Sequence, residues 1–538
     1  MLHTSGRGGL RASGVSGLLM ISVNLAACAG EKAEPEPTEP VQAPISIDVR
    51  RSLMITDEEI LKPFAFRRVM AVLSGGSADE PPSAAALALF HQWWDTQNDA
   101  SSAVGDGPHC DAEMVDGAPA MNGYPLLCPR AEGRMASVDP FEETLPDGEV
   151  NPDFYFPIGL ANRFDLATID GASCGEYRIL YAKRSAPEKR PGDRNLIIFE
   201  GGLPNPRPEL GLEGCRPVAE HVARLSTLDA AARAAELEGF FFEGLPGFEP
   251  VVAPSHYNGA MGHIRSNQFI AAETEAWTLK DFMVLEGEDG ARIVPLPVVN
   301  SPFVELFDAA STDPRAAAFR EHFVTQIPSL AMPDMERFFM QIPAEFLPGE
   351  SISSFTGLQI NPLEESSQAD YLRTFNTGAE TDDSFRVAIQ EELTALGSSL
   401  TPEHIVKRAL TQSCAGCHQI SGGALIQIGP PPDGQPPDGQ PGGPPPGGPP
   451  PPLVGDVERR DLGDGLQWST SLGFVHVSEE EFLREPGEDA GDRYLISAAL
   501  KERFLPHRKQ VLEQFLAGGV PSDASGGDGT LGGHPSEH

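Results

Sequence analysis

The segment TPEHIVKRALTQSCAGCHQIS, residues 401–421, is the most informative stretch of this chain of 538 residues. Thr401 is a good helix cap, and Pro402 suits the first position of the helix that follows. The pattern therefore predicts a helix over residues 403–412. Its inward-facing apolar residues are Ile405, Val406 and Leu410. This helix would lead directly into two cysteines three positions apart and a histidine.

The pentapeptide Cys414-Ala415-Gly416-Cys417-His418 has the spacing needed for covalent attachment of haem. On one helical turn, both thiols can reach the two vinyl groups of one porphyrin, and the adjacent imidazole lies beneath the iron. A redox-active cysteine pair and half of a zinc site are the alternatives. The chain has no second Cys-x-x-Cys to complete a zinc site, and the flanks lack the βαβ pattern of a redox pair.

This motif resembles the haem-binding signature of the cytochrome c family. The resemblance implies one covalent haem c, with Cys414 and Cys417 as thioether anchors and His418 as the proximal iron ligand. It implies an all-α cytochrome c-like domain over residues 381–520. An amphipathic helix is expected at 382–396, and another at 495–516 would pack across the helix 403–412, as the last helix of the family does.

The sixth iron ligand departs from the family, whose small members use a downstream methionine. No methionine follows Met340 in this chain. His476 lies in an apolar, extended stretch at about the expected position, so it is the candidate distal ligand; a histidine of the core is the alternative. His507 and Met332 are weaker candidates.

The N-terminal residues 1–27 have the features of a secretion signal, with two arginines, no acidic residue and an apolar run too short to span a bilayer. Leu25-Ala26-Ala27-Cys28 resembles the lipobox of bacterial lipoproteins, which implies lipidation of Cys28. An ordinary signal peptide is the alternative. Residues 28–45 form an acidic, Pro-rich tether. We therefore expect a lipid-anchored protein of the cell envelope, at the outer membrane, facing the periplasm or the exterior.

The remaining four cysteines fit an oxidising compartment. An even number of thiols outside the cytosol predicts two disulfides. Three pairings are possible, and the one between sequence neighbours joins Cys110 to Cys128 and Cys174 to Cys215. Each bond would stabilise the fold by roughly 3–4 kcal/mol.

The composition is that of an acidic globular protein, with 39 Lys and Arg against 78 Asp and Glu and a formal net charge of −39. This charge argues against nucleic acid as a partner and against electrostatic binding to anionic membranes. It suits a basic redox partner, although solubility alone also explains it.

The helix and strand patterns of residues 46–380 predict an α+β domain, and this region resembles no family that we can name. The expected fold class is thus an α+β N-terminal domain followed by the all-α cytochrome c-like domain. Helices are expected at 56–73, with a kink at Pro63, and at 83–98 and 226–238, and strands at 177–182, 195–200 and 292–296. The Pro- and Gly-rich composition of residues 429–452 predicts a surface insertion in the haem domain. Residues 521–538 are expected to be a disordered tail.

Three polar clusters in the first domain lie at 162–165, 176–178 and 263–267. An Arg beside an acid in apolar surroundings is more often a structural ion pair than a catalytic group. The sequence contains no nucleophile elbow, phosphate-binding loop or His-Glu-x-x-His motif, so no catalytic residue is assigned.

Three functional classes follow from these patterns. The first is a membrane-anchored electron carrier with a six-coordinate haem. The second is a haem enzyme, peroxidase- or oxygenase-like, with an open sixth position and a substrate pocket in the first domain. The third is a binding protein that haem only stabilises. We expect electron transfer, although the length of the chain exceeds what a carrier needs.

Overall fold

An antiparallel β-sheet organises the computed structural model, which describes residues 46–81, 83–185, 194–270, 276–288, 290–354, 370–421, 460–469, 476–479, 484–487, 491–519 and 529–532. These residues belong to one unit, Ile45–His538. The expected signal peptide, Cys28, the tether at 28–45 and the insertion at 429–452 lie outside the described residues.

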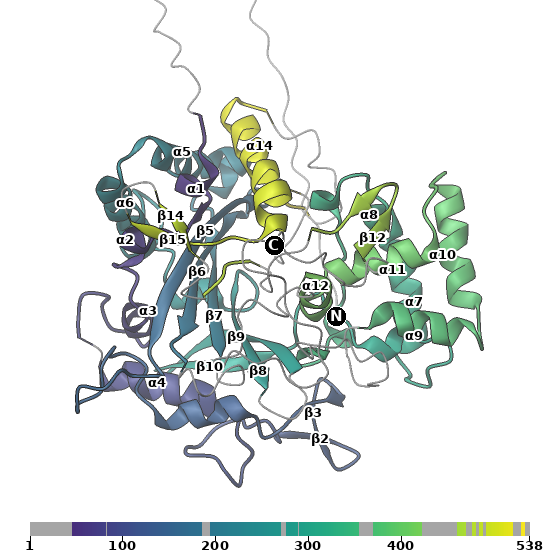
Figure 1. The fold of residues 1–538 in the computed structure, drawn as a ribbon, viewed down its shortest axis with the longest axis horizontal. Coiled ribbons are helices and arrows are strands. Elements are labelled where there is room, and N and C mark those ends of the chain that lie inside the picture. Colours follow the sequence, from purple (N-terminus) through teal and green to yellow (C-terminus); the bar gives the residue numbers. More distant parts are fainter. Residues whose placement is uncertain are drawn as a thin grey trace, which may run out of the picture. The chain divides into compact units, whose positions relative to one another are not determined.

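Eight strands form the central sheet, in the order β1-β5-β6-β7-β8-β9-β10, with β11 also paired to β9. Each neighbouring pair is antiparallel. The strands are β1 (Met54–Ile55), β5 (Tyr155–Ala167), β6 (Ser173–Lys183), β7 (Asn195–Pro204), β8 (His263–Ile270), β9 (Ala276–Gly287), β10 (Gly290–Leu296) and β11 (Ser351–Ser354). Figure 1 shows the long strands β5–β7 running beside helices of the N-terminal part.

Helices α1–α6 come from the N-terminal part of the chain, and α7–α14 from the C-terminal part (Figure 1). The first group is α1 (Val49–Ser52), α2 (Glu58–Leu61), α3 (Phe66–Leu73), α4 (Ala84–Asp95), α5 (Arg216–Arg224) and α6 (Ala230–Phe242). The second group is α7 (Ala316–Thr325), α8 (Ile327–Leu330), α9 (Tyr371–Ala379), α10 (Ser384–Ala395), α11 (Pro402–Thr411), α12 (Cys414–Ser421) and α14 (Leu505–Leu516).

The two faces of the sheet differ because successive residues of a strand point to opposite sides. On one face, aromatic side chains pack against α3 and α4. The ring centroids of Phe66 and Tyr181 are 5.1 Å apart, and those of Trp93 and Phe282 are 5.4 Å apart. The other face carries the intervening residues and lies beside α12. This second face builds the candidate site.

The expected fold class is wrong: the described residues contain no separate all-α domain. Helix α12 lies against β9 and β11 of the sheet, and Cys414 and Ala415 share an apolar cluster with Trp277, Leu279 and Val298. The cysteine motif therefore belongs to the same folded unit as the sheet. Local helical periodicity at 381–412 could not reveal this, because it says nothing of which surface a helix packs on.

The last helix also packs elsewhere than the family resemblance implies. Phe515 of α14 contacts Phe164 of β5, with ring centroids 5.0 Å apart, and the guanidinium of Arg216 lies over the Phe515 ring. Helix α14 thus covers the edge of the sheet near β5 and α5. It follows a π-helical turn, Leu500–Phe504, and Pro506 lies in its first turn.

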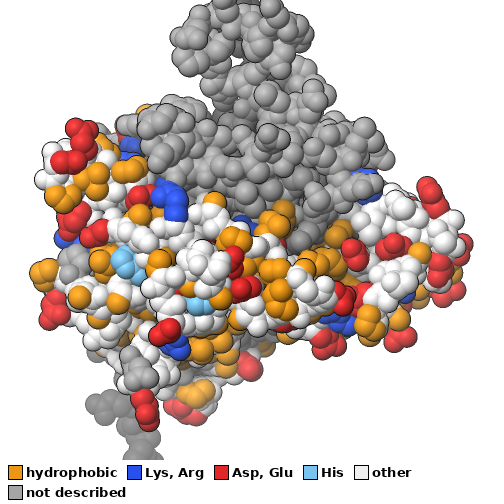
Figure 2. All heavy atoms as spheres, turned by 90° about the horizontal axis from the view of Figure 1, so that it is seen from below, with side chains coloured by type: hydrophobic (Ala, Val, Ile, Leu, Met, Phe, Trp, Pro, Cys, Tyr) orange, Lys and Arg blue, Asp and Glu red, His pale blue; other side chains and the backbone are white. Residues whose placement is uncertain are grey.

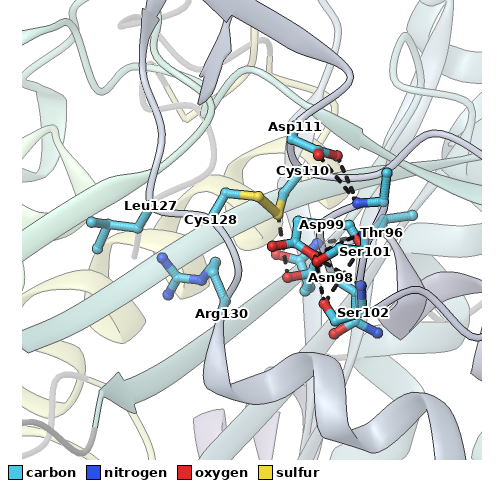
Figure 3. Close-up of a disulfide and its surroundings, with 12 residues drawn as sticks. Thr96, Asn98, Asp99, Ser101, Ser102, Cys110, Asp111, Leu127, Cys128 and Arg130 are labelled. Carbon is cyan, nitrogen blue, oxygen red and sulfur yellow. Dashed lines mark hydrogen bonds between the residues drawn. A yellow bond between two sulfur atoms is a disulfide. The ribbon is translucent and has the colours of Figure 1, made fainter. Parts of the chain in front are cut away.

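Two disulfides each join one cysteine to the next cysteine along the chain, Cys110 to Cys128 and Cys174 to Cys215. Figure 3 shows the first bond close to the turn after α4, where Asp99 accepts hydrogen bonds from Ser101 and Ser102. The segment it encloses contains β2 (Glu113–Val115), β3 (Ala118–Met121) and β4 (Tyr124–Pro125), which form a small sheet. Two further hairpins pair β12 (Asp461–Gly463) with β13 (Leu466–Gln467) and β14 (Arg484–Pro486) with β15 (Asp492–Tyr494).

Part of the tail expected to be disordered is ordered. Thr530 pairs with Thr168, and the backbone N–H of Leu531 donates to the carbonyl of Ala167 at 2.9 Å. Leu531 is fully buried. Residues 529–532 therefore extend the hydrogen bonding at the end of β5.

Several local predictions are confirmed and others need correction. The predicted helices at 83–98, 382–396 and 403–412 appear as α4, α10 and α11. The helix at 226–238 begins later, because Asp229 and not Ser226 caps α6. The helix at 56–73 is broken into α2 and α3, and the hydroxyl of Thr56 donates to the carbonyl of Tyr494 instead of capping α2.

The molecular surface agrees with the acidic composition. On the face shown in Figure 2, acidic side chains are spread among apolar and neutral ones, with only scattered basic groups. Every helix in the described ranges is too short or too polar to cross a bilayer.

Candidate functional site

Helix α11 delivers the cysteine motif to its place. The Thr401 hydroxyl accepts from the backbone N–H of His404, and the His404 ring accepts from the N–H of Thr401. This reciprocal cap confirms the predicted helix start. Within α11, the buried Arg408 guanidinium donates to the carbonyls of Leu330, Met332 and Leu462. These bonds hold α11 against neighbouring segments. Each of these three bonds ends on a backbone carbonyl and none on a carboxylate.

The start of α12 is anchored by serines. The backbone N–H of Cys414 donates to Ser301 Oγ at 3.2 Å, and that of Ala415 donates to Ser351 Oγ at 3.0 Å. The N–H groups of Gly416 and Cys417 donate to Ser413. The first N–H groups of a helix have no partner within it, so these serines replace water there. Since Ser351 begins β11, the sheet fixes where α12 starts.

The glycine of the motif is required by close packing. A Cβ added to Gly416 would lie 2.4 Å from both the carbonyl oxygen of Leu410 and Ser413 Oγ. Real side chains do not approach so closely, and backbone cannot easily give way. Gly416 therefore lets α12 turn tightly against the end of α11, which brings both cysteines and His418 to one side.

Cys414, Cys417, His418 and His476 line one pocket. Its other wall consists of alternate residues of strands β6–β9, together with Val477 and Glu479. The cavity volume is about 80 Å³, which is below the usual range of small-molecule and cofactor sites. Arg194, directly before β7, also lines it, and the strand residues that line it are Arg178, Leu180, Leu196, Ile198, Glu200, Arg265, Asn267, Trp277 and Leu279.

The strand register sorts these side chains by polarity along the pocket. Arg178 is paired across the strands with Glu200, and two residues along the strand Leu180 is paired with Ile198. Further along, Asn267 lies between Leu196 and Leu279. The wall therefore passes from charged groups at one end to a largely apolar centre, with Trp277 beyond it.

Both cysteines of the motif are buried, with 6% of Cys414 and 3% of Cys417 exposed, and neither forms a disulfide. Two reduced thiols three residues apart on a helix are the arrangement that thioether attachment of haem requires. The Oγ of Ser421 lies 3.8 Å from Cys417 Sγ and accepts from the indole N–H of Trp468.

The His418 imidazole is buried and stacked on the indole of Trp277. The ring centroids are 4.1 Å apart and the planes differ by 10°. Burial, with a smaller effect of Arg194, lowers the pKa of His418 to about 3. The ring is therefore neutral at neutral pH, which is the form that binds a metal ion.

His476 lies in a segment held by backbone hydrogen bonds. Its carbonyl accepts from the N–H of Ser497 at 2.8 Å, and Val477 pairs with Ile496. Burial lowers the pKa of His476 to about 3, and Arg178, Arg508 and Arg265 lower it further than Glu200 raises it. His476 is thus also a neutral imidazole. The structure brings it into the same pocket as His418, as the sequence hypothesis requires.

The charged end of the pocket is a buried ion-pair network around Glu200. This carboxylate lies 2.9 Å from His263 Nε2, 3.2 Å from Arg178 Nη1 and 3.5 Å from Arg265 Nε. These cations hold the pKa of Glu200 far below its usual value despite complete burial. The polar clusters at 176–178 and 263–267 are therefore ion pairs, as expected, but Arg178 and Arg265 also line the pocket, which sequence reasoning missed.

The other candidates lie apart from this pocket. The cluster at 162–165 contains the Arg163–Asp165 ion pair, at 2.8 Å, beside Arg508. The ring of His507 contacts the carbonyl of Gly532 at 2.9 Å. Neither His507 nor Met332 is among the residues that line the pocket. His476 is thus the candidate distal ligand that the structure brings near the motif.

The residues of this pocket fit a covalently bound haem. Two thiols and a neutral imidazole on one helical turn are the donor set that haem c requires. Apolar side chains at the centre suit a porphyrin face, whereas Arg178 and Arg265 are already paired with acidic side chains of the sheet. No model of a protein family, no curated protein and no solved structure matches this chain. The functional argument therefore rests on the pocket itself.

Proposed function

We propose that this chain is an exported c-type haem protein that binds one covalent haem c and transfers electrons. The observation that carries the proposal is the shared pocket of Cys414, Cys417, His418 and His476. Two thiols suited to covalent attachment and two neutral imidazoles meet there, from two segments that lie far apart in the sequence.

Each of these residues has a distinct role. Cys414 and Cys417 would hold the porphyrin through thioether bonds, and His418 would be the proximal ligand. His476, whose carbonyl accepts the hydrogen bond from Ser497, would be the distal ligand. The apolar residues Leu196, Ile198 and Leu279 would keep water away from the bound group. Bound haem supplies reversible one-electron oxidation and reduction at the iron.

The location follows from the sequence. Lipidation of Cys28 anchors the protein in the cell envelope, at the outer membrane facing the periplasm or the exterior. The acidic surface suits a basic redox partner rather than nucleic acid. The disulfides at Cys110–Cys128 and Cys174–Cys215 suit the same oxidising compartment.

Visible spectroscopy tests the proposal. Protein produced with a c-type maturation system is expected to give a haem c spectrum after the non-covalent pigment is removed with acidified organic solvent. The Cys414→Ala/Cys417→Ala double variant is the matched control and loses the pigment in that step. A colourless wild-type protein after the same treatment contradicts the proposal.

A haem enzyme is the second candidate function, and the buried charges beside His476 favour it. Arg178 and Arg265 lie in the same pocket, where a cation would stabilise negative charge on a small substrate bound at an open sixth position. In that case His476 does not bind the iron. The spin state of the wild-type protein separates the two functions.

A further inference from the structure

Trp277 is placed to control the orientation of the His418 ring. The two rings are parallel to within 10°, with centroids 4.1 Å apart. Trp277 covers a flat face of the imidazole, whereas the nitrogen lone pair that binds a metal lies in the plane of the ring. The stack therefore leaves ligation unhindered and restricts rotation of the ring about its Cβ–Cγ bond.

The indole is itself fixed by the sheet. Trp277 is 5% exposed and lies on β9, where it pairs with Ser353 of β11 on one side and with Phe269 of β8 on the other. It also belongs to the apolar cluster that contains Cys414 and Ala415 of α12. The paired strands fix the backbone of Trp277, and its buried indole cannot turn without moving the side chains of α12 that pack on it.

The helix that carries His418 is tied to the same part of the sheet. Ser351, which accepts the hydrogen bond from the N–H of Ala415, is paired with Leu279, two residues from Trp277 on β9. The backbone of α12 and the indole therefore share one rigid support. His418, one turn further along α12, meets the Trp277 ring in a fixed register.

We propose that Trp277 is a positioning residue for the proximal ligand: its indole sets the plane of the His418 imidazole relative to the iron. This inference rests on the proposed haem function. Groups that orient a metal-bound histidine commonly control the properties of the metal, because they fix the direction of the ligand orbitals. Trp277 performs this task by stacking on the ring face rather than by a hydrogen bond.

Two substitutions of Trp277 in the haem-loaded protein test the inference. Trp277→Leu keeps an apolar side chain but removes the flat face, and Trp277→Phe keeps a smaller one. The low-temperature EPR spectrum of a low-spin ferric haem depends on the planes of its axial imidazoles, so it reports the ring orientation directly. If the wild-type iron is high-spin, its cyanide adduct is low-spin and serves the same purpose.

The wild type is expected to give one narrow low-spin signal. Trp277→Phe should broaden it, and Trp277→Leu should replace it by two or more species. Trp468→Phe is the matched control, since Trp468 contacts Ser421 of the same helix, and it should keep the wild-type signal. The shift of the midpoint potential should be larger in Trp277→Leu than in Trp277→Phe, and Trp468→Phe should show no shift.

Haem-loaded Trp277 variants with the wild-type EPR signal overturn the inference and leave the proposed function intact. If Trp277→Leu does not fold, an unchanged signal in Trp277→Phe is sufficient to overturn it. A change of equal size in Trp468→Phe overturns it as well, because the effect then reports a general loosening of α12. Wild-type protein without covalent haem overturns the proposed function itself.

Discussion

The carbonyl of His476 accepts a hydrogen bond of 2.8 Å from the backbone N–H of Ser497, which holds the histidine in the pocket that also contains His418. We predict that His476→Ala converts a low-spin, six-coordinate iron into a high-spin one, because the distal nitrogen is lost while the backbone bond remains. The visible spectrum and the rate of cyanide or carbon monoxide binding measure the change. His507→Ala, whose ring contacts Gly532 outside the pocket, is the control and should leave both unchanged. A wild-type protein that is already high-spin and binds these ligands rapidly contradicts the carrier function and favours the enzyme.

Acid should destabilise the fold through His221. Burial, followed by Arg224, lowers its pKa from 6.5 to about 4 in the folded protein. Above pH 6.5 the ring is neutral in both states, but between 6.5 and 4 only the unfolded chain takes up the proton, so unfolding becomes more favourable as the pH falls. Between about pH 7 and about pH 5, the free energy of unfolding of the wild type should therefore fall by roughly 2 kcal/mol more than that of His221→Phe. Denaturant titrations at both pH values measure it, and an equal loss in the two proteins refutes the prediction.

The two disulfides should contribute unequally to stability. Cys174 and Cys215 are 41 residues apart and Cys110 and Cys128 are 18 apart, so the first bond restricts the unfolded chain more. Replacing Cys174 and Cys215 by Ala is expected to cost roughly 4 kcal/mol, against roughly 3 kcal/mol for the other pair. Peptide mapping without reductant should find all four residues oxidised in these pairs. Unmodified thiols at these positions would refute the assignment.

Membrane attachment should depend on Cys28. Lipid on this cysteine is expected to carry the protein into the detergent phase of a two-phase extraction, because two or more acyl chains anchor a protein stably. Cys28→Ser should leave the protein in the aqueous phase or as an uncleaved precursor. Wild-type protein that enters the aqueous phase without lipid on Cys28 contradicts the anchor.

The local part of the candidate site was predictable from the sequence, and the non-local part was not. Thr401 and Pro402 start α11 as predicted, and the cysteine motif identified one wall of the pocket. The hypothesis about His476 used only its position after the motif and its apolar surroundings. Trp277 gave no signal, because its contact with His418 exists only through the pairing of β9 in the sheet.

The sequence did not predict all strands of the pocket wall, because some of their buried side chains are charged or polar. In β8, His263, Arg265 and Asn267 occupy the alternate positions that face the pocket side, where a buried strand normally has apolar residues. Ion pairs with Glu200 and Asp281 allow these charged side chains to be buried. The residues of β8 were therefore interpreted as a polar cluster rather than a strand. Neither β8 nor β9 was predicted. The separate all-α domain was wrong for a related reason, since helical periodicity does not report the sheet beneath α12.

The most direct test of the account is mass spectrometry of the peptide that contains Cys414 and Cys417, from wild-type protein produced with a c-type maturation system. The account predicts one haem bound to this peptide through both cysteine sulfurs. Either single substitution, Cys414→Ala or Cys417→Ala, should reduce the attachment to one thioether bond. The peptide with two unmodified thiols, or with the thiols joined to each other, in fully matured protein would contradict the central claim.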